Sequence, residues 1–137
     1  MGLRVDLLNL VDVKEGIVIA AARANGTVNG TGVDRRENRG RGVVRLKSGA
    51  GTGTAPTLDV SVQDSTDDVT YATVAAAQFA GFTQVTTVAS VQAVAIDLDG
   101  CNRYIRARGV TAGAAGGGHV YTVDFILPAG PDVPSPS

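Results

Sequence analysis

Residues 57–68, TLDVSVQDSTDD, decide the fold class of this chain. Leu58, Val60 and Val62 alternate with polar residues, so the apolar side chains all point to one side of an extended backbone. This alternation is typical of a β-strand with one buried face and one solvated face. The acidic residues from Asp64 onward then favour a turn, because aspartate and serine side chains hydrogen-bond to the nearby backbone.

Similar short segments occur along the rest of the chain, separated by turns rich in glycine, asparagine and aspartate. We expect residues 82–88 to pair with residues 92–98, and residues 103–110 to form the last hairpin with residues 119–127. One short helical turn is expected at residues 74–79. About eight short strands with turn signals between them predict an antiparallel β-sandwich or jelly roll. The other expected strands are residues 17–22, 33–34, 42–48 and 69–74.

The composition restricts the possible partners. The 137 residues suit one domain that buries its core without a metal ion or a disulfide. A net charge of −1 argues against nucleic-acid binding, and the single cysteine, Cys101, excludes an intramolecular disulfide. No run of about 18 apolar residues is present, and the N-terminus lacks the pattern of a secretion signal. We therefore expect neither a nucleic acid nor a membrane as a partner.

The chain divides into three parts. We expect an extended N-terminal arm at residues 1–15, a β-sandwich domain at residues 16–127, and a flexible tail at residues 128–137. The arm mixes apolar residues with Asp6 and Asp12, while the tail holds four of the five prolines. A segment of that composition cannot bury enough apolar area to fold alone, so it is either disordered or extended against a neighbour.

The sequence offers no convincing set of catalytic residues. Cys101 and His119 are the strongest candidates for a nucleophile and a base. Catalysis by such a pair also requires a third group that orients the base and a site that binds the oxyanion, and the sequence indicates neither. A small packed thiol and a surface imidazole are the simpler interpretation. We therefore expect no enzyme activity.

Two further patterns are compatible with ligands but have simpler explanations. Asp64, Asp67 and Asp68 supply the oxygen atoms that Ca²⁺ prefers, yet the EF-hand spacing is missing and the same residues form ordinary turns. The glycine-rich runs at residues 49–53 and 113–118 lack the lysine and the following helix of a phosphate-binding loop. We expect no metal ion and no cofactor.

Arginines give the clearest candidate contact surfaces. Arg35, Arg36, Arg39 and Arg41 form a basic cluster that fits an acidic partner or a neighbouring subunit, because guanidinium groups bind carboxylates through paired hydrogen bonds. A solvated loop whose ion pairs contribute little is the alternative. A second candidate surface is the outward face of residues 103–110, which carries Tyr104 with two arginines, Arg106 and Arg108.

A sugar-binding jelly roll is a structural alternative. Sugar sites usually stack the sugar ring on an aromatic platform. This chain has no tryptophan, and only Tyr71 and Tyr104 are not needed for the core.

Several stretches carry a resemblance to a known group of proteins. They are NGTGVD at 29–34, GAGTGTAPTLDV at 49–60, QDS at 63–65, FTQVT at 82–86, NRYIRA at 102–107 and YTVDF at 121–125. Together they resemble small structural proteins of tailed bacteriophages, in particular the jelly-roll head proteins that decorate or cement a capsid lattice. The match covers about residues 16–127. Similar small β domains also occur in tail parts, and the relatives lack the basic loop at residues 35–41 in this form.

The resemblance implies a virion structural protein, and within that class a capsid decoration or cement protein that binds the assembled lattice and stabilises it. Its expected partners are the major capsid protein and further copies of itself in a homotrimer. Its expected location is the capsid surface, after synthesis in the cytoplasm of the host bacterium. A phage tail or adaptor protein and a carbohydrate-binding module are the alternatives. The expected contact residues are Leu3, Val5, Leu7, Leu8 and Leu10 in the arm, and Arg35, Arg36, Arg39 and Arg41 in the loop.

Overall fold

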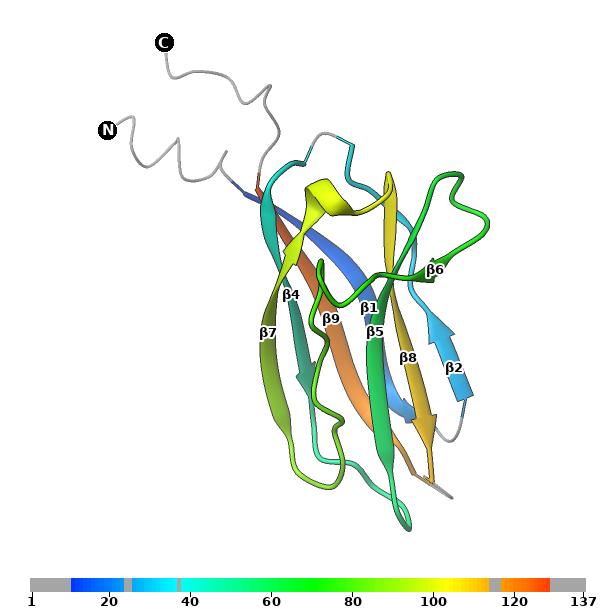
Figure 1. Cartoon of the computed structure of the whole chain (residues 1–137). Helices are drawn as coiled ribbons and strands as arrows, with labels where there is room; N and C mark the ends of the chain where they lie inside the picture. Colours follow the sequence, from blue (N-terminus) through cyan, green and yellow to red (C-terminus); the bar gives the residue numbers. More distant parts are fainter. Residues whose placement is uncertain (1–10, 24–25, 37, 114–116, 129–137) are drawn as a thin grey trace, which may run out of the picture.

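The computed structural model describes residues 11–23, 26–36, 38–113 and 117–128, which form two antiparallel β-sheets packed face to face (Figure 1). These residues contain nine strands and one short 3-10 helix, η1. No helix among them has the length and apolar character needed to cross a membrane. The elements are β1 (Val11–Arg23), β2 (Gly26–Asn29), β3 (Val33–Asp34), β4 (Arg41–Ser48), β5 (Thr57–Ser65), β6 (Ala72–Thr73), β7 (Ser90–Asp97), η1 (Leu98–Gly100), β8 (Tyr104–Ala112) and β9 (His119–Pro128).

The chain crosses several times between the two sheets. The first sheet has the order β1-β9-β4-β7. The second has the order β2-β8-β5-β6, with β3 also paired to β8. The predicted all-β antiparallel sandwich is confirmed, with nine strands in the described residues where about eight were expected.

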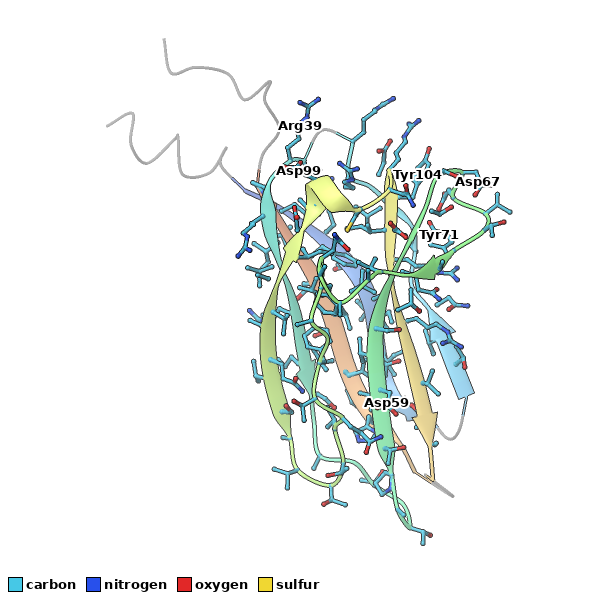
Figure 2. The ribbon with its side chains drawn as sticks, in the orientation of Figure 1. Arg39, Asp59, Asp67, Tyr71, Asp99 and Tyr104 are labelled. Carbon is cyan, nitrogen blue, oxygen red and sulfur yellow. The ribbon has the colours of Figure 1, made fainter. Side chains whose placement is uncertain are left out.

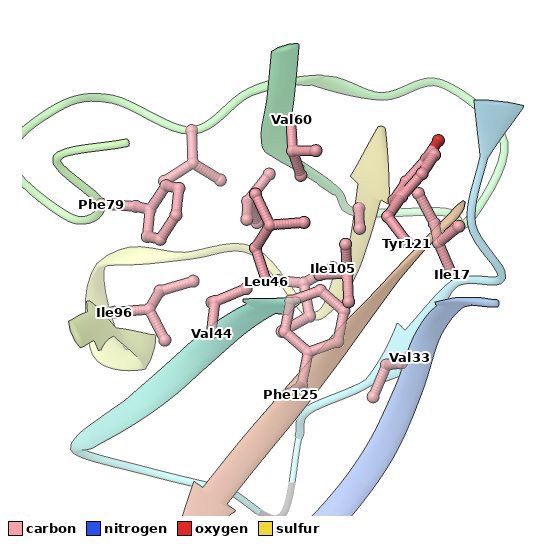
Figure 3. Close-up of a cluster of buried hydrophobic side chains, with 14 of the residues drawn as sticks. Ile17, Val33, Val44, Leu46, Val60, Phe79, Ile96, Ile105, Tyr121 and Phe125 are labelled. Carbon is pink, nitrogen blue, oxygen red and sulfur yellow. The ribbon is translucent and has the colours of Figure 1, made fainter. Parts of the chain in front are cut away.

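The core lies between the sheets and is built by alternating residues. On β5, Leu58, Val60 and Val62 are buried as the sequence pattern predicted, while Asp59 is exposed. Figure 3 shows how side chains from both sheets meet, with Val44 and Phe125 from the first sheet close to Ile105 from the second. Removing this much valine, leucine and isoleucine from water is the main favourable contribution to folding.

Strand β9 contributes the largest inward-facing surface. Tyr121, Val123, Phe125 and Leu127 are all buried. The Phe125 ring needs the absence of a side chain at Gly16, because a Cβ there would lie 2.9 Å from its Cε2 atom. The pairing of β1 with β9 shifts register at this glycine, so the irregularity in β1 makes room for the ring.

Two predicted strand pairings are wrong. Residues 82–88 do not form a strand that pairs with residues 92–98; β7 pairs with β4 instead. In that segment Val85 is tied to β5 through two backbone hydrogen bonds with Leu58 of 2.8 and 3.0 Å, and Thr83 exchanges hydrogen bonds of 2.7 and 2.8 Å with the Gln92 side chain of β7. The residues on either side of Val85 are exposed. The segment therefore packs one valine side chain against the core, and a longer strand would bury neither neighbouring side chain.

The expected last hairpin is also absent. β8 pairs with β2, β3 and β5, whereas β9 pairs with β1 and β4. Both strands carry a continuous apolar face, and placing them in opposite sheets lets the two faces bury each other. Hairpin pairing would instead have put them side by side in one layer.

The remaining differences concern the ends of elements. β1 begins at Val11, earlier than the strand expected at residues 17–22, and pairs there with Pro128 of β9. The strand expected at residues 69–74 is reduced to Ala72–Thr73. The helical turn expected at residues 74–79 is a single turn, in which the Gln78 and Phe79 amides donate to the Ala75 carbonyl. The boundaries proposed for arm, domain and tail stay predictions.

The position of Phe125 gives the first testable prediction. We expect Phe125→Ala to lower the free energy of unfolding by about 3–5 kcal/mol, because it removes a fully buried ring and leaves a cavity. The measurement is equilibrium unfolding in urea. Val88→Ala, at a site that is 74% exposed, is the matched control and should change stability by less than about 0.5 kcal/mol. Equal effects of the two substitutions would contradict this account of the core.

Candidate partner-binding site at the arginine-rich end

The basic loop between β3 and β4 is anchored to the turn that precedes β8. The Arg35 amide donates to the Arg103 carbonyl at 2.9 Å. The Arg35 guanidinium donates to the Asn102 carbonyl at 2.9 Å and also to the Cys101 carbonyl. Arg35 therefore connects the two loops, and its guanidinium N–H groups give hydrogen-bond partners to two backbone carbonyls.

The other side of the loop is held equally well. The Leu98 amide donates to the Gly40 carbonyl at 2.8 Å, and the Gly40 amide donates to Oδ1 of Asp99 at 3.1 Å. The buried Asn38 side chain donates to the Pro128 carbonyl at the end of β9 at 2.7 Å. Gly40 has a φ of 82°, a conformation that favours glycine. The loop is thus tied to both sheets and presents its remaining side chains on a fixed frame.

Those side chains surround an open depression of about 510 Å³ at this end of the sandwich. Figure 2 places Arg39 and Asp99 at the same end as Tyr104. The Arg36 side chain is 63% exposed, and its nearest acidic partner is 4.0 Å away. Four guanidinium groups face few carboxylates here, which makes the depression suited to an anionic group. Its lining residues are Arg35, Arg36, Arg39, Asp99 and Arg103.

Asp34 organises the arginines on the β8 side. Its Oδ2 atom accepts a hydrogen bond from the Arg103 guanidinium at 2.9 Å. This hydrogen bond holds the pKa of Asp34 below its ordinary value of 3.8, and the Arg36 amide and the two positive charges act in the same direction. The Arg103 guanidinium also lies 4.9 Å from the centre of the Tyr104 ring. Arg103 is therefore fixed in position, while the Arg36 side chain forms only a long ion pair with Asp34, at 4.0 Å, and is 63% exposed.

The structure brings together three of the four predicted arginines. Arg35, Arg36 and Arg39 line the depression, whereas Arg41 lies at the start of β4 and is the cross-strand partner of Asp97. Arg103 was missed as a member of this group, because its place depends on the pairing of β3 with β8, which the sequence does not indicate. Residues 1–10, with the five leucines and valines expected to make contacts, lie outside the described residues, as do residues 129–137 of the tail.

The second predicted surface lies on the outer face of β8. Tyr104, Arg106 and Arg108 alternate with buried residues, as expected. The Arg106 guanidinium lies 4.0 Å from the centre of the Tyr71 ring and donates to the Gln63 side chain at 2.9 Å. The face of the Tyr71 ring is therefore already covered by a cation, which makes it a poor platform for stacking a sugar.

The acidic turn after β5 has a structural explanation. The Ser65 hydroxyl accepts hydrogen bonds from the Asp67 and Asp68 amides at 3.1 and 3.0 Å. Asp67 in turn accepts from the Val69 and Thr70 amides, both at 3.0 Å, and these bonds lower its pKa. Among the described residues, no group of three histidine, cysteine or acidic side chains is placed to hold a metal ion.

Cys101 and His119 have no neighbour in common. The Cys101 thiol is buried beside the Asp97 carbonyl, and burial raises its pKa to about 11, so it stays protonated at neutral pH. The His119 ring hydrogen-bonds to the Thr86 carbonyl at 2.9 Å near the start of β9. Cys101 lies in the connection between η1 and β8, whereas His119 begins β9, and no hydrogen bond between described residues joins the two side chains as the nucleophile and base pair considered from the sequence would require.

Comparison with solved structures gives two proteins with a similar fold and a third, weaker match. The exported protein XepA of phage PBSX has a TM-score of 0.55 and 19% identity; the match covers 87% of this chain and 37% of XepA. The VP2 subviral particle of infectious bursal disease virus has a TM-score of 0.50 and 13% identity, over 88% of this chain and 32% of VP2. The prophage-derived protein YomS has a TM-score of 0.44 and 14% identity, over 88% of this chain and 96% of YomS.

These likenesses concern the fold. No protein-family model matches the chain, and neither does any curated protein sequence. The chain spans little more than a third of XepA and about a third of VP2. At this level, the resemblance to phage structural jelly-roll proteins predicted from the sequence is confirmed.

The Asp34–Arg103 pair gives a prediction about pH. Because the pKa of Asp34 is lowered in the folded protein, its ionised form stabilises the fold above the ordinary pKa of 3.8, and this contribution disappears as the pH falls through the lowered value. We expect Asp34→Asn to be less stable than wild type at pH 7, by less than about 1 kcal/mol because the pair is partly exposed. The difference should shrink as the pH falls below 3.8 and also in high salt. Thermal unfolding across this pH range measures it, and a difference that stays constant with pH would contradict the assignment.

Proposed function

We propose that this chain is a virion structural protein that acts by binding and not by catalysis. The observation that carries the proposal is the arginine-lined depression on a loop fixed to both sheets. Rigid presentation of guanidinium groups lowers the conformational entropy lost on binding, which is the requirement for a contact surface. The described residues bring together no nucleophile, base and orienting group of the kind that an enzyme would need.

The shared fold supports the same class of function. VP2 of infectious bursal disease virus forms a subviral particle, so this type of sandwich is used in a particle shell. XepA is a phage protein with a similar fold. A sandwich of two sheets leaves its loops and its outer faces available for neighbours, which suits a building unit that works through geometry alone.

Within that class, we propose a capsid decoration or cement protein that lies on the capsid surface and contacts the major capsid protein. Arg36 and Arg39 would meet carboxylates of the shell, and the apolar residues of the arm at residues 1–10 would pack against a neighbour. A protein that binds only the assembled lattice stabilises it by mass action, without changing the shell itself. Synthesis in the host cytoplasm belongs to the same proposal.

A tail or adaptor protein is the alternative that shares this chemistry. Copy number distinguishes the two, because a decoration protein is present in numbers comparable to the major capsid protein and a tail protein in far fewer copies. The covered Tyr71 ring weakens the carbohydrate-binding alternative, since it removes one of the two aromatic platforms.

The experiment that tests this function measures binding of the full chain to expanded heads of its phage. We expect wild type to bind the heads and to raise their melting temperature. The double variant Arg36→Ala, Arg39→Ala should bind about tenfold more weakly or worse, because two exposed contacts to carboxylates are lost. Its own unfolding temperature should change little, because the Arg36 side chain is 63% exposed and its ion pair with Asp34 is 4.0 Å long.

The comparison variant is Arg108→Ala on the second candidate surface of β8, which should leave binding unchanged if the depression makes the contact. Binding by wild type should weaken as salt is raised. The proposal is wrong if wild type does not bind the heads, or if stripped and decorated heads melt at the same temperature.

A further inference from the structure

The outer face of the first sheet carries an apolar row that crosses all four strands. The strand registers place Val13 beside Ile126, Ile126 beside Val43, and Val43 beside Ala95. Cross-strand partners project from the same face of a sheet, so these four side chains form one band. Val13 is 63% exposed and Ile126 and Val43 are half-buried. No described residue covers the band.

The next row along the strands is charged. Glu15 lies beside Asp124, Asp124 beside Arg45, and Arg45 beside Ala93. Although Arg45 and Asp124 are direct cross-strand partners, no ion pair within 4.0 Å joins them in the described part of the chain. Their charges therefore remain available to a partner that approaches the face.

A third row mixes apolar and polar residues. Val18 lies beside Thr122, Thr122 beside Lys47, and Lys47 beside Val91. Val18 and Val91, at the two edges of the sheet, are 54% and 67% exposed. Every exposed large hydrophobic residue that lies on a described strand belongs to this sheet, whereas the outer face of the second sheet carries polar and charged residues such as Ser61 and Arg108.

We propose that this face binds the same face of a second copy of the chain, through a two-fold axis that runs along the strands midway between β9 and β4. That axis puts β9 of each copy over β4 of the other. Ile126 then lies over Val43, and Asp124 lies over Arg45, each contact occurring twice. At the edges, Val18 lies over Val91. In this arrangement each row meets its own copy, with apolar residues opposite apolar residues and Asp124 opposite Arg45.

Other arrangements do not match the rows as well. A shift of one strand in either direction would set Asp124 over Asp124 or Arg45 over Arg45, and like charges that face each other weaken an interface. Packed sheets keep their strands within about 30° of each other, which preserves the row-on-row contact near the axis. The two-fold pair also differs from the homotrimer that the resemblance suggested.

The size of the face sets the expected affinity. The sheet has four strands, spaced about 4.8 Å apart. A length of eight residues, as in β4 and β7, at about 3.3 Å per residue gives a face of roughly 500 Å². Two copies would bury about 1,000 Å² in total, which is at the lower end for a specific interface. The pair should therefore be weak in dilute solution and strengthen wherever the chain is concentrated on a surface.

The test is sedimentation velocity of the full chain over a wide range of concentration. We expect wild type to move from monomer towards dimer as the concentration rises. Arg45→Asp and Asp124→Arg should each weaken the dimer about tenfold or more, because each puts like charges opposite one another twice. The double variant Arg45→Asp, Asp124→Arg restores the opposition and should recover the dimer.

Arg108→Asp, the same charge change on the outer face of the second sheet, is the control and should leave the dimer intact. Val13→Lys, at an exposed position, provides a second disruption if the charge variants fail to fold. The proposal is overturned if wild type stays monomeric, if its mass reaches a trimer, or if the double variant does not recover. None of these outcomes depends on capsid binding.

Discussion

Strand β9 is the element on which the rest of the structure depends. It lies between β1 and β4, and one of its faces buries Tyr121, Val123, Phe125 and Leu127. An apolar face of this size can be removed from water only if another sheet covers it, and β8 and β5 supply that cover. The need to bury the inner face of β9 therefore explains why β8 lies in the opposite sheet, although it precedes β9 directly in the chain.

The same requirement positions the arginine-rich end. Once β8 pairs with β3, Arg103 lies beside Asp34, and the loop that follows β3 is drawn against the turn before β8. Arg35 then finds the carbonyls of Asn102 and Cys101, and Asn38 finds the end of β9. The arrangement of charges at this end is thus a consequence of core packing at a distance, and the exposed arginines add little to stability themselves.

The sequence predicts the strands far better than their pairing. Alternation in β4, β5, β8 and β9 is visible because each has one apolar and one polar face. Pairing is not visible, because an apolar strand fits equally well beside or opposite another apolar strand, and only the combined packing of all nine decides between them. Residues 82–88 have strand-forming composition but a single buried residue, Val85, so tertiary contacts override local preference. The arginine cluster was predictable from its spacing, whereas Arg103 joins it only through the topology.

The antiparallel partnership of Val11 with Pro128 has a consequence for how the chain is connected to anything else. The first described residue of β1 and the last of β9 are neighbours, so both extensions leave from one pole of the sandwich, beside the basic loop. The opposite pole holds the turn at residues 49–56, the last residues of β8 and the first residues of β9. Thr52 pairs with Gly118 there. The two ends of the sandwich therefore differ: one carries the basic loop and the first and last described residues, and the other carries turns. A circularly permuted chain, in which a short linker joins Pro128 to Val11 and the far turn is opened, would keep every described strand pairing while placing its new ends at the other pole.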